Sequence, residues 1–177
     1  MTYTTNSTQT NTKLWLAVKQ RRQAAGFTVV EMLTAVAIFG ILATVAVPSF
    51  SSLIASQRAS AMATDIYVAL VESRSEAVKR NVNVTLAQSS GGWHAGWMIQ
   101  APDPNNGSNT LTLESHSVAT GTGISGPDNV VYQSSGRVQG NSAPCFGITA
   151  TQGSSSAQKW VTIDLSGRPL VKTSSCS

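Results

Sequence analysis

A long uncharged stretch dominates the pattern of hydrophobic and polar positions in this chain. Between Phe27 and Val47 the only ionisable residue is Glu31. A helix rises about 1.5 Å per residue, so a stretch of this length spans roughly 30 Å, the thickness of the hydrocarbon core of a bilayer. The pattern predicts a membrane-spanning helix over residues 27–47.

After this span the pattern predicts that residues 48–80 continue the helix in amphipathic form. Pro48 removes one helical hydrogen bond, so a kink or local loosening is expected there. Small and apolar residues recur every three or four positions and predict a face that lies on a sheet: Ala59, Met62, Ile66, Ala69, Ser73 and Ala77. Charged residues spaced by seven mark another face, expected to be solvated or in part to pair between subunits: Arg58, Asp65, Glu72 and Lys79.

From residue 81 onward, hydrophobic and polar residues alternate as in half-buried strands. The predicted strands are Val82–Leu86, the stretch around Leu111 and Leu113, and the ranges 97–100, 129–133, 146–151 and 159–165. Turn signals separate them, among them Gly121-Thr122-Gly123 and Ser166-Gly167-Arg168-Pro169. The expected fold class is α+β, with a long N-terminal helix packed on an antiparallel β-sheet domain formed by residues 81–177.

The charge of the chain belongs mostly to its first 26 residues. Four of the 12 basic residues and none of the eight acidic ones lie there, so the formal charge of +4 disappears in the remainder. Lys and Arg beside an apolar span stay in the cytoplasm, which places the domain after residue 47 in the periplasm. Residues 1–26 are therefore interpreted as a basic leader at the inner membrane.

Two features distinguish this segment from a secretory signal. The small residues Ala24-Ala25-Gly26 precede the apolar region, so a cut there would leave that region in the product. Glu31 lies inside the span, where a charge costs about 2.5 to 3.5 kcal/mol and should be tolerated only with a partner. The alternative is a stray glutamate at the membrane edge.

Gly26, Phe27 and Glu31, opening a long apolar helix after a basic leader, resemble the prepilin motif of the type IV pilin and pseudopilin superfamily. The resemblance implies that a prepilin peptidase cuts after Gly26 and methylates the new amino terminus at Phe27. It also implies that Glu31 pairs with the amine of Phe27 on a neighbouring subunit during assembly. The leader is long for this family, and Val18 read as a start codon is an alternative to Met1.

The globular part resembles the GspH/FimT family of minor pilins and pseudopilins. The resemblance rests on Ala69-Leu70, Ser73–Ala77, Val82–Leu86, Trp93, Gly96-Trp97 and Gly167-Arg168. It implies a subunit assembled with other pilins into a type II secretion pseudopilus or a type IV pilus. The FimT-like branch implies DNA binding for uptake through a glycine-arginine motif followed by a further basic residue. Here Pro169 and Leu170 follow Gly167-Arg168 instead.

Basic residues outnumber acidic ones near the C-terminus, where Asp164 is the only acid after residue 130. The candidate DNA contacts are Arg137, Lys159, Arg168 and Lys172. The alternative is that Arg168 follows a tight turn and Lys172 is a solvated charge on an edge strand. Trp93 and Trp97 are expected to be core residues rather than a stacking platform for bases or sugars.

The remaining chemistry argues for a structural protein. Cys145 and Cys176 are the only cysteines, and an oxidising periplasm favours a disulfide over two free buried thiols. His94 and His116, the only histidines, stand in no nucleophile or metal motif. No glycine-rich phosphate loop is present either. The sequence therefore predicts neither an enzyme nor a bound cofactor.

Overall fold

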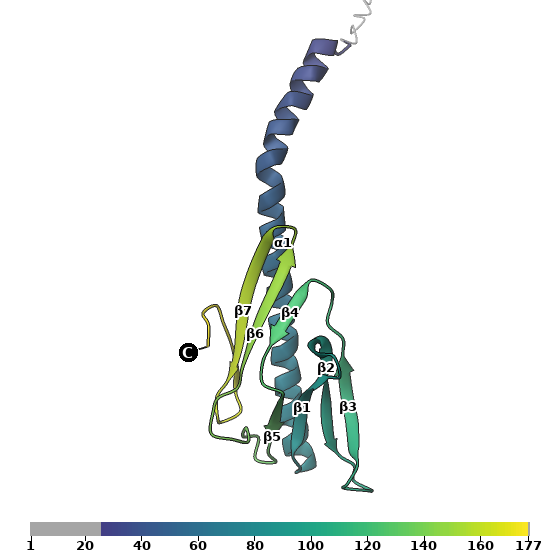
Figure 1. Cartoon of the computed structure of the whole chain (residues 1–177), viewed down its shortest axis with the longest axis vertical. Helices are drawn as coiled ribbons and strands as arrows, with labels where there is room; N and C mark the ends of the chain where they lie inside the picture. The colour runs from purple at the N-terminus through teal and green to yellow at the C-terminus, as the bar shows by residue number, and fades with distance from the viewer. Residues whose placement is uncertain (1–25, 177) are drawn as a thin grey trace, which may run out of the picture. The chain divides into compact units, whose positions relative to one another are not determined.

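The computed structural model describes residues 26–176 (Figure 1), and the leader predicted for residues 1–26 lies almost entirely outside this range. One long helix, α1 (Val29–Arg80), comes first. The strands that follow are β1 (Val84–Ser89), β2 (Gly92–Pro102), β3 (Thr110–His116), β4 (Thr122–Ser125), β5 (Asn129–Tyr132), β6 (Cys145–Gln152), β7 (Ser155–Ile163) and β8 (Pro169–Lys172). The chain divides into two compact units between Phe39 and Gly40.

The described part of the first unit, residues 26–39, contains the start of α1. Its large apolar side chains are exposed, among them Phe27, Val30, Leu33 and Phe39. The helix is long and apolar enough to cross a membrane, and none of its most apolar window is buried. The helix predicted over residues 27–47 is present from Val29 onward.

In the second unit, α1 continues through Pro48 without interruption, so the expected loosening does not break the helix. Proline in a helix costs one backbone hydrogen bond. Hydroxyl groups on both sides of it donate to helix carbonyls: Thr44 Oγ1 to Ile41 O at 2.7 Å and Ser49 Oγ to Val45 O at 3.2 Å. The helix ends at Arg80, as the sequence predicts.

Two antiparallel sheets complete the second unit. The first has the strand order β3-β2-β1-β5 and the second β4-β6-β7-β8. Every strand pair is antiparallel. The α+β class is confirmed, although the sequence pattern did not separate the strands into two sheets.

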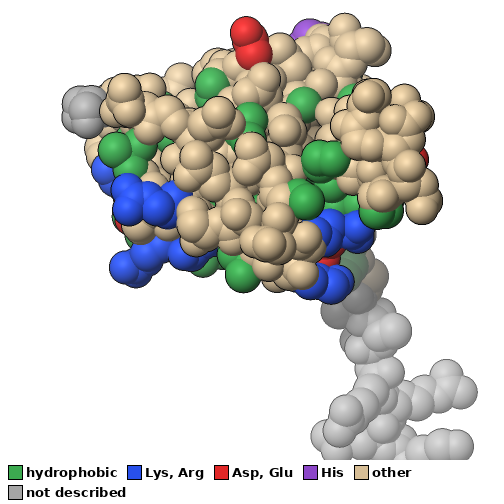
Figure 2. Space-filling view, turned by 90° about the horizontal axis from the view of Figure 1, so that it is seen from below, with side chains coloured by type: hydrophobic (Ala, Val, Ile, Leu, Met, Phe, Trp, Pro, Cys, Tyr) green, Lys and Arg blue, Asp and Glu red, His purple; other side chains and the backbone are tan. Residues whose placement is uncertain are grey.

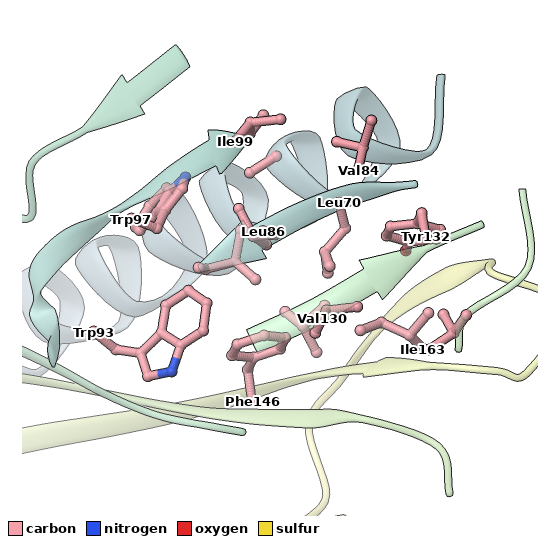
Figure 3. Close-up of a cluster of buried hydrophobic side chains, with 14 of the residues drawn as sticks. Leu70, Val84, Leu86, Trp93, Trp97, Ile99, Val130, Tyr132, Phe146 and Ile163 are labelled. Atoms are coloured by element: carbon pink, nitrogen blue, oxygen red, sulfur yellow. The ribbon is translucent and has the colours of Figure 1, made fainter. Parts of the chain in front are cut away.

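The core lies between α1 and the sheets (Figure 3). All six residues of the predicted small-residue face of α1, from Ala59 to Ala77, are buried. Met62, Ile66, Ala69 and Ala77 from this face pack in one cluster with Leu86, Tyr132, Phe146 and Ile163 from the strands. Burying apolar surface is the main driving force of folding, so this face fixes how α1 lies in the unit.

The final residues of two predicted turns belong to strands. Thr122 and Gly123, read as turn residues, belong to β4 and pair with β6. Pro169 begins β8, at the edge of the second sheet, where a proline removes no ladder hydrogen bond that a central strand would need. Both strands have only four residues, too few for a clear alternating pattern.

β2 is much longer than the predicted strand over residues 97–100. Gly96 interrupts its pattern with φ of 134°, a conformation that side chains rarely adopt. A Cβ at Gly96 would clash with the carbonyl oxygen of His116 on β3. Gly96 therefore allows β2 and β3 to approach closely where Trp97 enters the core.

Candidate functional site

The residues of the predicted processing site lie just before α1. Gly26, Phe27 and Thr28 are exposed, and Phe27 has 77% of its surface accessible. A Cβ added at Gly26 would meet no atom within 4 Å. Nothing in the described chain requires a glycine there, so any such requirement would come from an enzyme that binds the segment.

Glu31 lies in the first turn of α1, where the backbone N–H groups lack helical partners. Thr28 satisfies one of them, because its Oγ1 accepts a hydrogen bond from the Glu31 N–H at 3.2 Å. The Thr28 carbonyl accepts from Met32 N–H, so Thr28 is the N-cap of α1. A carboxylate in this turn also complements the positive end of the helix dipole. The threonine-to-glutamate spacing was a readable cap signal that the prediction did not use.

The candidate DNA contacts fall into two groups, and the first consists of Arg137 and Arg168. Arg137 ends a turn after β5, and Arg168 ends the turn between β7 and β8. These turns touch, because a Cβ at Gly167 would clash with the carbonyl oxygen of Gly136. With φ of 85° as well, Gly167 is required by the fold itself. We call residues 133–137 and 164–168 the arginine turns.

The second group, Lys159 and Lys172, is divided between the two faces of the second sheet. The register of β7 and β8 sets Trp160 opposite Lys172, so these two side chains share one face of the sheet. Lys159 precedes Trp160 and therefore lies on the other face. The four candidate contacts do not form one basic patch.

Asp164 reduces the positive charge of the arginine turns. Its Oδ1 accepts hydrogen bonds from Ser166 Oγ at 2.6 Å and from the Arg168 backbone N–H at 2.9 Å. These bonds, with a smaller contribution from the Arg168 charge, hold the pKa of Asp164 below its usual value. Asp164 is thus both a turn residue and a partial counter-charge.

Arg74 adds a third arginine to this region. Its Nε donates to the carbonyl oxygen of Gly136 at 3.0 Å and ties α1 to the first arginine turn. Sequence patterns could not have found this contact, because the partners stand 62 positions apart. Figure 2 shows the face seen from below, where Lys and Arg side chains gather along one border and most of the surface is uncharged.

The tryptophans belong to the core, as expected. Trp93 and Trp97 are 4% and 3% exposed, too little for either to stack on a ligand. Trp93 Nε1 donates to Pro127 O at 2.7 Å, and its ring meets Phe146 edge to face. Trp97 stacks on His116.

Cys145 and Cys176 form a disulfide, which confirms the predicted pairing. It joins the start of β6 to the segment after β8. Within residues 26–176, no group of three or more His, Cys, Asp or Glu is placed to hold a metal ion.

Comparison with known proteins assigns the family. A long N-terminal helix that continues into an antiparallel β domain and packs on its sheets is typical of a pilin-like protein. Residues 62–167 match the family described as type II transport protein GspH, and residues 21–47 match a prokaryotic N-terminal methylation motif. The chain belongs to the GspH family.

Solved structures show the same fold. The type IV minor pilin FimU of Pseudomonas aeruginosa superposes with a TM-score of 0.55 at 18% identity, covering 66% of this chain and 89% of FimU. The minor pseudopilin EpsH of the Vibrio cholerae type 2 secretion system gives 0.52 at 14% identity, covering 66% of this chain and 97% of EpsH. Comparison with curated protein sequences gave no match.

Family, motif and fold together define a minor pilin or pseudopilin. Proteins of this family and fold are structural components of pili and pseudopili. The apolar start of α1 is the corresponding single-pass anchor in the inner membrane.

Proposed function

We propose that this chain is a minor pseudopilin of a type II secretion system. The observation that carries the proposal is the GspH match over residues 62–167, joined to the methylation motif over residues 21–47. Prepilin peptidase would cut after Gly26 and methylate Phe27. The leader would lie in the cytoplasm and the second unit in the periplasm, because the basic residues precede the apolar span.

Assembly would follow from the charge of Glu31. Once the cut exposes the amine of Phe27, the Glu31 carboxylate of a neighbouring subunit gains a cationic partner inside the apolar layer. A paired carboxylate is tolerated there, whereas an isolated one is costly. Glu31 would therefore drive the transfer of the anchor from the membrane to the filament.

Incorporation into a type IV pilus with DNA binding is the competing role. The two arginine turns favour it, because they meet at Gly136 and Gly167 and each carries an exposed arginine, Arg137 or Arg168. Asp164, which accepts a hydrogen bond from the Arg168 backbone N–H, weighs against a continuous DNA-binding surface. The separation of Lys159 from Lys172 does so as well.

Replacement of Gly26 tests the processing step. Gly26→Leu should leave the full-length precursor in the membrane, since the exposed site tolerates a side chain and only the peptidase would reject it. Ala25→Leu, next to it, is the control for general damage to the segment. Intact mass of the membrane-extracted protein distinguishes the forms, and normal cleavage of Gly26→Leu would refute the assignment of this site.

The secretion role is tested by deleting the gene in its own bacterium. Loss of the subunit should leave type II secretion substrates in the periplasm, and the wild-type gene should restore their export. Normal secretion with a loss of pili would assign the chain to the type IV pilus instead.

A further inference from the structure

The second sheet turns one face to the core and the other outward. Phe146 on β6 and Val161 on β7 are buried in the core, so the residues that alternate with them lie on the outer face. Strand pairing sets four residues of the outer face in one row, one from each strand: Ser125, Gly147, Trp160 and Lys172. The outer face therefore carries a tryptophan with small and polar neighbours.

Trp160 differs from the two core tryptophans. It does not belong to the core cluster, and its side chain is only half-buried. Its Nε1 and Cδ1 lie 3.5 and 3.7 Å from the position that a Cβ at Gly147 would take, so the indole extends over β6. Unlike the Nε1–H of Trp93, its Nε1–H donates to no residue within 26–176. Gly147 thus makes room for an aromatic surface with a free hydrogen-bond donor.

A hollow of about 480 Å³ adjoins this tryptophan. Leu170, Lys172 and the Cys145–Cys176 disulfide line it. Lys172 also stands opposite Trp160 in the register of β7 and β8, so the hollow and the indole are neighbours. Sites for small ligands have volumes of about 300 to 1,000 Å³ and combine apolar walls with a few polar groups. The hollow and Trp160 together have these properties, and we call them the Trp160 surface.

The charges of the Trp160 surface do not suit a polyanion. Of the two Lys or Arg residues in the strands of the second sheet, only Lys172 lies on the outer face. Asp164 lines the same hollow and balances it. A nucleic-acid strand is held mainly by several cations that neutralise its phosphates. The other outer residues near Trp160, Gln158 and Thr162, offer amide and hydroxyl groups, which match the hydroxyls of a sugar.

We propose that the Trp160 surface binds an oligosaccharide of N-acetylated amino sugars, the glycan strand of the cell wall. A sugar ring would lay its C–H bonds on the electron-rich face of the Trp160 indole. Gln158 and Thr162 would form hydrogen bonds with the sugar, and an acetyl methyl group would enter the hollow against Leu170. Lys172 would pair with a carboxylate that branches from the strand. The inference rests on the periplasmic placement of the second unit in the proposed function.

Binding of soluble saccharides to the purified, detergent-solubilised full-length chain tests the proposal. Isothermal titration calorimetry with a trimer of N-acetylglucosamine should show saturable binding. A glucose trimer with the same linkage is the matched control, because it lacks the acetamido groups, and it should bind about tenfold more weakly or less.

Substitution of Trp160 tests where the saccharide binds. Trp160→Ala should weaken binding of the N-acetylglucosamine trimer about tenfold or more, whereas Trp160→Phe keeps an aromatic ring and should retain most of the affinity. Tyr67→Ala is the matched control, since Tyr67 is an aromatic residue of α1 with 37% exposure that lies away from the second sheet's outer face. It should bind as the wild type does. Thermal unfolding of each variant reports whether it is folded.

Lys172→Ala tests the charged part of the contact. It should weaken binding of a cell-wall disaccharide that carries the muramic carboxylate and leave binding of the neutral trimer unchanged. An equal effect on both saccharides would contradict the proposed role of Lys172.

Three results would overturn the inference: no saturable binding to the wild type, binding that folded Trp160→Ala retains, or a preference for single-stranded oligothymidylate over the saccharides. Loss of stability in Trp160→Ala, with no binding to the wild type, would assign the indole to packing on Gly147 alone. The titration requires neither cleavage of the leader nor secretion. Its failure would therefore leave the proposed function standing, and a failure of the processing or secretion tests would leave a measured saccharide affinity intact.

Discussion

At the scale of single residues, Glu31 contributes to the start of α1 and also places a charge in the apolar span. Its backbone N–H is capped by Thr28, and its carboxylate lies in the first turn of a helix whose N-terminus favours negative charge. That contribution is about 0.3 to 1 kcal/mol, less than the cost of an unpaired charge in a membrane. Helix capping alone therefore does not account for a glutamate at this position.

We expect Glu31→Val to be cleaved and inserted normally but to fail in assembly. Removing the charge makes the span more apolar, which favours insertion, and also removes the proposed partner of the Phe27 amine. Thr28→Val is the matched control, because it removes the helix cap and keeps the carboxylate. Sedimentation of sheared filaments measures incorporation; filaments that contain Glu31→Val at wild-type levels would contradict the assembly role.

Sequence could identify the motif over residues 21–47, because its residues are close together. Gly26, Phe27 and Glu31 lie within six positions of one another. The two cysteines could be predicted to pair once the domain was placed in the oxidising periplasm. Gly167 shows what the sequence could not predict. It looked like half of a glycine-arginine motif, but its contact with Gly136 depends on how two distant turns meet in the folded unit.

At the scale of elements, α1 carries neighbouring carboxylates with opposite behaviour. The pKa of Glu76 is lowered by hydrogen bonds from Arg80 and Lys79, whereas burial and Glu114 raise that of Glu72. The seven-residue spacing of the charges was visible in the sequence. Their different surroundings were not, because these depend on the position of β3.

Glu72→Gln should stabilise the second unit at neutral pH. A raised folded-state pKa means that ionised Glu72 destabilises the fold, so its favourable contribution exists at low pH and is lost as pH rises through the folded pKa. The advantage of the variant should vanish near about pH 4, where carboxyl groups become protonated.

Glu76→Gln is the control with the opposite sign. The contribution of Glu76 is present above its unfolded pKa and is lost as pH falls through the folded value. The variant should therefore be less stable than the wild type at neutral pH. Thermal unfolding of the detergent-solubilised chain at several pH values measures both, and a Glu72→Gln variant without a pH-dependent gain would contradict the repulsion.

The disulfide holds the C-terminal segment to the start of β6. Its cysteines stand 31 positions apart, and closing a loop of that size stabilises by about 3 to 4 kcal/mol in the chain-entropy model. Cys176→Ser should lower the free energy of unfolding by up to that amount, measured with denaturant. Cys145→Ser and the double variant should be equally destabilised, and two alkylatable thiols in the native protein would disagree with the bond.

At the scale of the whole molecule, the sequence predicted the anchor, the domain and their family, because periodicity and composition report on long elements. The arrangement of charge over the surface was less accessible. It depends on the strand order, which sets β3 and β5 at opposite edges of one sheet, and no local pattern encodes that order.

This arrangement of charge indicates which substitutions would test DNA binding. If the chain binds duplex DNA, we expect the arginine turns to supply most of the contact, because they meet in the folded unit, whereas Lys159 and Lys172 lie on opposite faces of their sheet. Two or three neutralised phosphates give a log–log salt slope of roughly −2 to −3 and weak affinity. Arg137→Ala with Arg168→Ala should then abolish binding, while Lys159→Ala should leave it unchanged. Titration of the purified chain at low salt measures this; an absence of binding would exclude DNA uptake, and binding that survives the double substitution would place the DNA contact elsewhere.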